Sequence, residues 1–238
     1  MGMTKKLLIV FASGLMLSLV LLSSAFVIGG PELSKRFNDG KGFSVKVITD
    51  KDGPKTSRTF VFDPAKPLAL AVSAKLRFTR GDKVSMEVTG PQKVVNALTW
   101  EDGRLASNGG IQVSGDGIEV KITAPRLTAL ILQSATGAKL EGLDQPSLKI
   151  ESRGAIDLSA SGRVDSLDID LAGASEVDMR EVAAKDARIV TKGASDVTIA
   201  ATGKVDVEIN GAGTVSLKAK PAQLTSRING VGSVDNDY

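Results

Sequence analysis

The sequence contains no cysteine and no histidine. Without cysteine the chain can form neither disulfides nor thiolate metal sites, and it has no thiol nucleophile. Without histidine it lacks the commonest general base and the commonest side-chain metal ligand, and it cannot build a Ser-His-Asp triad. These two absences exclude many of the familiar arrangements for catalysis and metal binding.

Aromatic residues and concentrated charge are also scarce. The chain has one Trp, one Tyr and seven Phe among 238 residues, few for a surface that stacks on sugars or single-stranded nucleic acid. The formal net charge is +3, and no run of basic residues provides the dense patch that nucleic-acid binding requires. We therefore expect no nucleic-acid partner.

The N-terminus has the pattern of a targeting segment. Lys5 and Lys6 precede an uncharged apolar stretch, residues 7–28, and small residues ending at Ala25 would suit a signal peptidase. The stretch is longer than a signal core of ~7–15 residues and reaches the ~20 residues of a membrane span. Residues 1–30 are expected to be a cleaved signal peptide or a retained transmembrane anchor. In both cases the body is exported across the inner membrane to the periplasm or cell surface.

Residues 126–238 contain an internal repeat marked by glycine. The glycines are spaced by 18 to 20 residues and small residues follow them: Gly154, Gly173, Gly193, Gly211 and Gly230. Thr136, 18 residues before the first of these glycines, is taken as the equivalent position of an earlier copy. Apolar and polar residues alternate on both sides of each glycine, as in Val205, Val207 and Ile209. Alternation with period two indicates strands with one buried face, whereas a helix would show a period of about 3.6.

Each repeat unit is predicted to be a strand, a tight turn at the glycine, a second strand and a return loop, as at Gly142–Pro146 and Ser161-Gly162. One unit cannot cover its own apolar face, but units stacked in parallel ~4.8 Å apart can. The predicted fold is all-β, a parallel β-helix or β-solenoid with coils of about 18–20 residues. We attribute the recurring glycine to a corner with a positive φ or without space for a Cβ atom.

Residues 31–125 are also rich in strand-forming residues but less regular. The stretches with strand character are Thr59–Phe62, Leu68–Val72, Val84–Val88 and Ile118–Ile122. No low-complexity linker separates this part from the repeats. We expect it to cap or extend the start of the solenoid formed by residues 126–238.

Two copies of the repeat share an Ile-Asn-Gly motif: they read Ile209-Asn210-Gly211-Ala212-Gly213 and Ile228-Asn229-Gly230-Val231-Gly232. Weaker copies surround Gly173 and Gly193. With these motifs the chain, over about residues 68–238, resembles the family described as "putative auto-transporter adhesin, head GIN domain". The resemblance implies a β-solenoid in an exported bacterial protein and supplies no catalytic residues. Because the sequence stops at Tyr238, soon after the last copy, no translocator domain is expected after it.

The repeat register predicts two outward columns of charged residues. One column, five positions before each glycine, alternates in sign: Lys149, Asp168, Arg188, Asp206 and Thr225. Ion pairs between neighbouring coils are expected along it. The other column, three positions after each glycine, begins with three acids: Asp157, Glu176 and Asp196. Stacked carboxylates repel one another unless a hard cation binds them, so these residues are the candidate metal ligands, although we expect them to face water without a metal.

These features predict a non-catalytic binding or structural module of the cell envelope or cell surface, similar in role to an adhesin. No cofactor and no catalytic residue are expected. Its partner would be an envelope component, a glycan or a protein, with the membrane as a further partner if residues 7–28 are retained. The alternative is a carbohydrate-active solenoid enzyme, of the pectin lyase type or a glycosidase. A glycosidase would need two carboxyl groups ~5–9 Å apart in a deep cleft.

Overall fold

The computed structural model describes residues 47–48, 54–108, 112–113 and 117–238. Residues Lys46–Tyr238 form one compact unit. The predicted signal peptide or anchor, residues 1–30, lies outside the described residues. Within the described residues, no helix is long and apolar enough to span a membrane.

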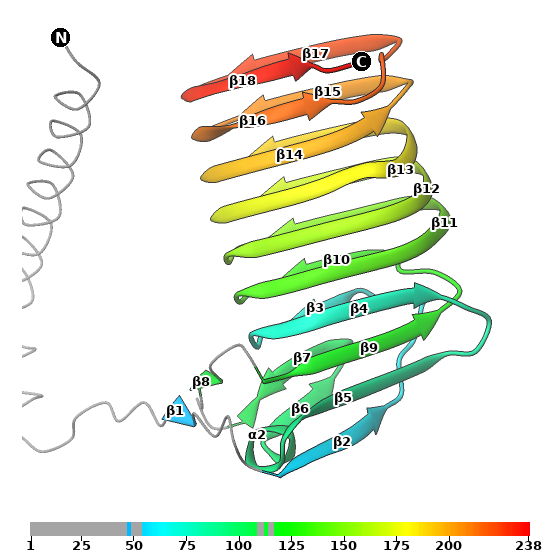
Figure 1. Cartoon of the computed structure of the whole chain (residues 1–238), viewed down its shortest axis with the longest axis vertical. Helices are drawn as coiled ribbons and strands as arrows, with labels where there is room; N and C mark the ends of the chain where they lie inside the picture. The colour runs from blue at the N-terminus through cyan, green and yellow to red at the C-terminus, as the bar shows by residue number, and fades with distance from the viewer. Residues whose placement is uncertain (1–46, 49–53, 109–111, 114–116) are drawn as a thin grey trace, which may run out of the picture. The chain divides into compact units, whose positions relative to one another are not determined.

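The predicted all-β solenoid is confirmed, because parallel strands stack coil upon coil along one axis (Figure 1). The strands of the repeat region are β10 (Ala129–Leu132), β11 (Thr136–Ser152), β12 (Ile156–Leu171), β13 (Ala174–Thr191), β14 (Ala194–Ala201), β15 (Lys204–Ile209), β16 (Ala212–Leu217), β17 (Gln223–Ile228) and β18 (Val231–Asn236). In register, Lys149 opposes Asp168, Asp168 opposes Arg188, and Arg188 opposes Asp206. These steps of 19, 20 and 18 residues agree with the predicted coil length.

The prediction that Thr136 occupies the glycine position of the first copy is wrong. Thr136 pairs with Ile156, which lies two residues beyond Gly154. Ser134 lies beneath Gly154 instead, since a Cβ atom added to that glycine would come within 2.8 Å of the Ser134 backbone. A shift of two residues preserves the alternation of inward and outward side chains, so periodicity alone could not reveal the error.

The corner opposite the glycine turn, here called the wide corner, also differs from the prediction. Return loops were expected there, but β11, β12 and β13 continue around it as single strands of 17, 16 and 18 residues. The ladders only shift register at this corner, between Leu140 and Leu143 and between Ser159 and Ser161. Gly142 supplies a positive φ of 72° where the backbone bends.

The lower end of the solenoid is formed by residues 54–124, whose elements are shorter. They are β2 (Lys55–Phe60), β3 (Leu68–Leu70), β4 (Ala74–Arg80), β5 (Ser85–Pro91), α2 (Gln92–Asn96), β6 (Leu98–Glu101), β7 (Arg104–Ser107) and β9 (Glu119–Ala124); β1 (Val47–Ile48) and β8 (Gln112–Val113) form a separate pair. The strand expected at Thr59–Phe62 is misplaced, because β2 ends at Phe60 and Val61 is 90% exposed. The other three expected strands are present with shifted ends.

The stacking order at this end differs from the chain order. Strands β3 and β4 pair with β10 and β11 above and with β7 and β9 below. The coil of residues 68–80 therefore lies between the layer of β7 and β9 below and the coil of β10 and β11 above. Below it the pairing becomes antiparallel, through β5, β2 and β6, and these strands close the lower end together with α2 (Figure 1).

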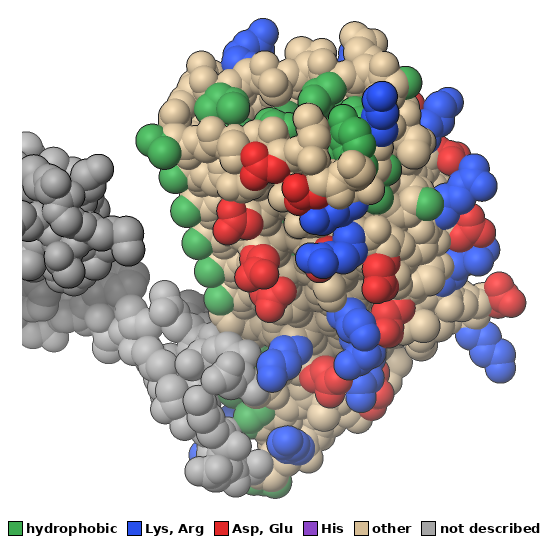
Figure 2. Space-filling model, turned by 45° about the horizontal axis from the view of Figure 1, so that its top comes forward, with side chains coloured by type: hydrophobic (Ala, Val, Ile, Leu, Met, Phe, Trp, Pro, Cys, Tyr) green, Lys and Arg blue, Asp and Glu red, His purple; other side chains and the backbone are tan. Residues whose placement is uncertain are grey.

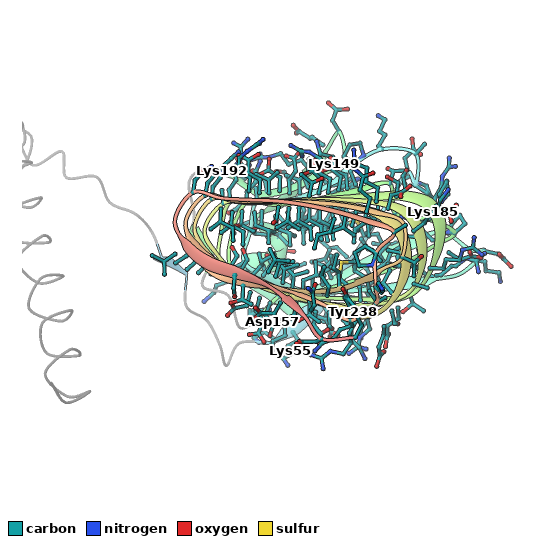
Figure 3. The ribbon with its side chains drawn as sticks, turned by 90° about the horizontal axis from the view of Figure 1, so that it is seen from above. Lys55, Lys149, Asp157, Lys185, Lys192 and Tyr238 are labelled. Carbon is teal, nitrogen blue, oxygen red and sulfur yellow. The ribbon has the colours of Figure 1, made fainter. Side chains whose placement is uncertain are left out.

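The interior consists of stacked apolar side chains from the two faces of the flattened coils (Figure 3). One such ladder is fully buried, with Ile150, Ile169, Ile189 and Val207 each 0% exposed. Because each ladder runs through successive coils, every coil covers the apolar surface of the next.

Candidate functional site

The narrow corner of the solenoid, where each coil turns sharply, is built from a ladder of glycines. A Cβ atom added to Gly193 would overlap the carbonyl oxygen of Gly173 and lie 2.8 Å from its nitrogen. Gly211 has the same relation to Gly193. Among the five repeat glycines, Gly173 alone has a positive φ, of 136°. Of the two predicted reasons for glycine at this corner, a positive φ and lack of space for a Cβ atom, lack of space is therefore the main one.

Exposed small apolar residues follow the glycine position on successive coils. They are Ala135, Ala155, Ala174, Ala194, Ala212 and Val231. Figure 2 shows hydrophobic side chains in a row along one edge of the solenoid. The narrow corner thus presents a smooth apolar margin.

The three acids predicted to share a column do so in the structure. Asp157 opposes Glu176, and Glu176 opposes Asp196, on the adjacent strands β12, β13 and β14. All three are exposed, and none forms an ion pair within the described residues. We call these three residues the acidic column. Figure 3 places Asp157 on the face opposite Lys149 and Lys192.

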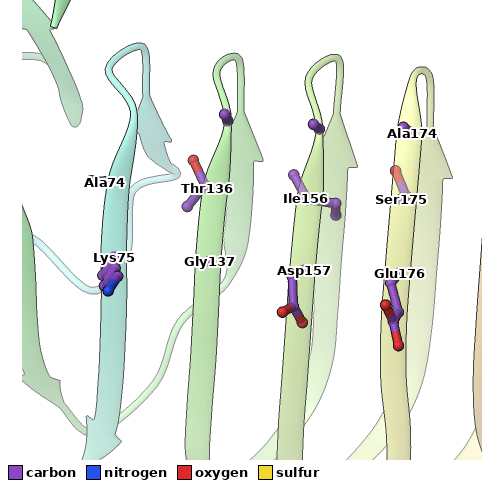
Figure 4. Close-up of a pocket in the computed structure, with 11 residues that line it drawn as sticks. Ala74, Lys75, Thr136, Gly137, Ile156, Asp157, Ala174, Ser175 and Glu176 are labelled. Carbon is purple, nitrogen blue, oxygen red and sulfur yellow. The ribbon is translucent and has the colours of Figure 1, made fainter. Parts of the chain in front are cut away.

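A shallow hollow of about 520 Å³ lies between the apolar margin and the acidic column (Figure 4). Its lining is Ala74, Lys75, Ala135, Thr136, Gly137, Ala155, Ile156, Asp157, Ala174, Ser175 and Glu176. Gly137 stands in register between Lys75 and Asp157 and has no side chain to fill the space. A Cβ atom added there would have nothing within 4 Å. We call this feature the corner hollow.

Sequence reasoning missed both Gly137 and Lys75 as site residues. Gly137 was assigned to the turn because Thr136 was taken for the glycine position. Its true position is inside a strand, where a glycine often marks a place that another molecule approaches closely. The sequence showed the glycine but not its place inside a strand, because the first copy was misaligned by two residues.

The acidic column does not converge on one point. Figure 4 shows Asp157 and Glu176 extending side by side from neighbouring strands. In the described part of the chain, no group of three acidic side chains is close enough to hold a metal ion. A cation at this face would find oxygen ligands on one side only.

We expect Glu176→Gln to leave the melting temperature unchanged or raise it slightly. The substitution removes the central carboxylate from between two like charges, a repulsion of about 0.2–1 kcal/mol per pair. Millimolar calcium should shift the melting temperature of neither protein, and Glu181→Gln, outside the column, serves as the control. A calcium-dependent rise in the parent that Glu176→Gln abolishes would instead establish a metal site.

The negative charge of a neighbouring acid on the same face is balanced by an arginine. The Arg180 side chain donates from Nε to the Asp178 carboxylate at 2.8 Å. This hydrogen bond is the main cause that lowers the pKa of Asp178, so the carboxylate stays ionised at neutral pH and loses this stabilising contact only in acid. The unpaired negative charge of this region is therefore concentrated in the acidic column.

The alternating column on the opposite face forms one of the expected ion pairs between coils. Arg188 Nη1 lies 3.3 Å from the Asp168 carboxylate. Lys149 instead pairs with Glu151 on its own strand, at 2.6 Å, and the hydrogen bond that Lys149 donates to this carboxylate raises the pKa of Lys149. Exposed pairs of this kind are screened by solvent and contribute little to stability, so they help to fix the register without dominating the free energy of folding.

Comparison with known proteins gives a family match and several structural matches. A family model described as "Putative auto-transporter adhesin, head GIN domain" matches residues 67–221. A structure of a "putative adhesin" from Bacteroides fragilis is similar with a TM-score of 0.63 at 16% identity, covering 78% of this chain and 98% of that chain. Two structures from Parabacteroides distasonis, a "putative lipid binding protein" and a "putative adhesin", have TM-scores of 0.42 and 0.45 at 15% and 18% identity, with the same coverage. No curated protein matches the chain.

Proposed function

Because this chain belongs to the head GIN domain family of "putative auto-transporter adhesins", we propose that it is a non-catalytic, adhesin-like binding module at the bacterial cell envelope or cell surface. The family description supports an exported protein with a binding role. The observation that carries the proposal is the corner hollow beside the acidic column: an open recess on a rigid face, flanked by fixed charges of both signs.

The rigidity of this face favours binding. Successive strands hold Lys75, Asp157 and Glu176 at fixed multiples of the ~4.8 Å strand spacing. A ligand that docks there does not have to order loops, so less of the contact energy is lost to conformational entropy. The surplus of carboxylates suits an envelope glycan or protein that presents positively charged groups.

The alternative function, a carbohydrate-active enzyme, receives less support from this geometry. Asp157 and Glu176 lie on adjacent strands, but both side chains are exposed beside a shallow recess. A glycosidase needs its two carboxyl groups on opposite sides of a glycosidic bond, which requires a cleft that encloses the sugar.

A binding assay with matched variants tests the proposal. The full chain, in detergent, is measured against arrays of envelope glycans and purified envelope proteins. The variant Asp157→Asn, Glu176→Gln, Asp196→Asn keeps side-chain shape while removing three charges, and it should weaken binding by about tenfold or more. The control carries the same kind of change outside the acidic column: Asp165→Asn, Glu181→Gln and Asp206→Asn.

Two outcomes would contradict the proposal. Equal loss of binding in both triple variants would place the binding surface elsewhere. Release of reducing or unsaturated sugar ends by the parent would show catalysis. Mass spectrometry of the mature N-terminus from cell envelopes checks the export that the proposal requires.

A further inference from the structure

The upper end of the solenoid, formed by β17 and β18, presents unpaired strand edges. Within the described residues, β17 pairs with β15 alone and β18 with β16 alone. Each strand therefore has a row of backbone N–H and C=O groups directed away from the coil beneath it. Such edges are templates for pairing with another strand. The lower end differs in the described residues, because its outermost strands β2 and β6 are antiparallel to their neighbours β5 and β7 (Figure 1).

Apolar side chains that belong to the interior are exposed at this end. Leu224 and Ile228 are 38% and 41% exposed, whereas Val205 and Ile209, directly beneath them, are 0% exposed. Figure 2 shows hydrophobic side chains on the upper surface. Another layer of strands would bury them as each coil buries the one below.

The same end carries a side-chain ladder that can be extended. Asn229 donates from Nδ2 to Oδ1 of Asn210, one coil below, at 2.9 Å. This geometry leaves the Asn229 side-chain oxygen as an acceptor for a donor on a further layer. A further layer of strands would thus pair the free backbone groups, bury the exposed apolar side chains and extend the asparagine ladder.

From these features we propose that the upper end is an interface for a second copy of this chain. A second copy can supply two further strands of matching length if the copies are related by a two-fold axis that runs along the strand direction. The chain turns back between β17 and β18, so these strands run in opposite directions on opposite faces. The rotation therefore places β17 of one copy beside β18 of the other as an antiparallel pair.

Charge favours this pairing over the alternative. On β17 the outward residue with charge is Arg227, and on β18 it is Asp235. The two-fold arrangement brings Arg227 of each copy directly opposite or diagonal to the partner's Asp235, within reach of the long arginine side chain. If β17 paired with β17 and β18 with β18, like charges would approach instead.

Analytical ultracentrifugation of the full chain in detergent, over a range of concentrations, tests the interface. We expect a concentration-dependent dimer. Arg227→Glu and Asp235→Arg should each weaken it by about tenfold, because each turns two attractions into two repulsions. The double variant with both changes should restore the parental dissociation constant. Arg153→Glu, an exposed residue on a lower coil, should have no effect.

Two further measurements show whether a variant loses the dimer because it is misfolded, or whether the copies associate through another contact. Melting temperatures at the lowest concentration should agree among the variants, since these side chains face outward. If neither single charge reversal changes the dissociation constant, the proposal is overturned. Self-association through the apolar N-terminal stretch would give that result. A monomer whose β17 and β18 amides are protected from hydrogen exchange would also overturn it, because another segment of the same chain would then cover the edge.

Discussion

Replacing Gly193 with valine is expected to lower the free energy of unfolding by about 2–4 kcal/mol. The new side chain would collide with the carbonyl group and nitrogen of Gly173, which are backbone atoms held in place by the coil below. Relief would require separating two coils and weakening their ladder. Denaturant unfolding, followed by far-ultraviolet circular dichroism, measures the loss.

Gly137→Ala is the matched control for that experiment. It adds a Cβ atom to a glycine in the same solenoid, at a position where nothing lies within 4 Å. We expect a change of less than about 0.5 kcal/mol, as for other exposed positions. If Gly193→Val unfolds at the same denaturant concentration as Gly137→Ala, the close stacking of Gly193 on Gly173 is contradicted.

Gln145→Ala is expected to cost about 2–4 kcal/mol, because buried backbone groups lose their partners. Gln145 is 7% exposed, and its side chain accepts from Leu127 N at 2.9 Å. It also donates from Nε2 to Leu127 O at 2.7 Å and to Ser147 O at 2.8 Å. Leu127 precedes the first strand of the repeat region, so this side chain takes the place of strand pairing there.

Two further substitutions distinguish hydrogen bonding from packing at this position. Gln145→Met retains much of the side-chain volume but none of the three hydrogen bonds, and it should be nearly as destabilising as Gln145→Ala. Gln133→Ala removes an exposed glutamine whose bond from Arg104 is 3.3 Å long, and it should be neutral. Parental stability in Gln145→Met would show that the hydrogen bonds contribute little.

The parts of the fold that could be predicted are those fixed by the repeat itself. Glycine spacing sets the coil length, and alternation sets which residues face outward, so the acidic column and the Asp168–Arg188 pair followed from the sequence. The first coil was misaligned because Ser134 replaces glycine there. The wide corner was misjudged because its glycines bend a continuous strand and do not interrupt it.

The corner hollow and the lower end depend on contacts that leave little trace in the sequence. The hollow exists because Gly137 aligns with Lys75, and these residues belong to strands that are not consecutive in the chain. Leu68 likewise pairs with Leu130, 62 positions later. No local pattern identifies such a partner, because both strands would fit equally well against several apolar neighbours.

The position of the coil of residues 68–80 between two later coils constrains the order in which the chain can fold. When the chain becomes available from its N-terminus, as during synthesis, β3 and β4 appear before either neighbouring layer exists. These strands must remain unpaired until β7, β9, β10 and β11 have followed. The upper coils have no such delay, because each finds its lower neighbour already in place. We therefore expect the lower end to fold later than its place in the sequence implies, and its unpaired strands to be the ones most exposed to aggregation in the meantime.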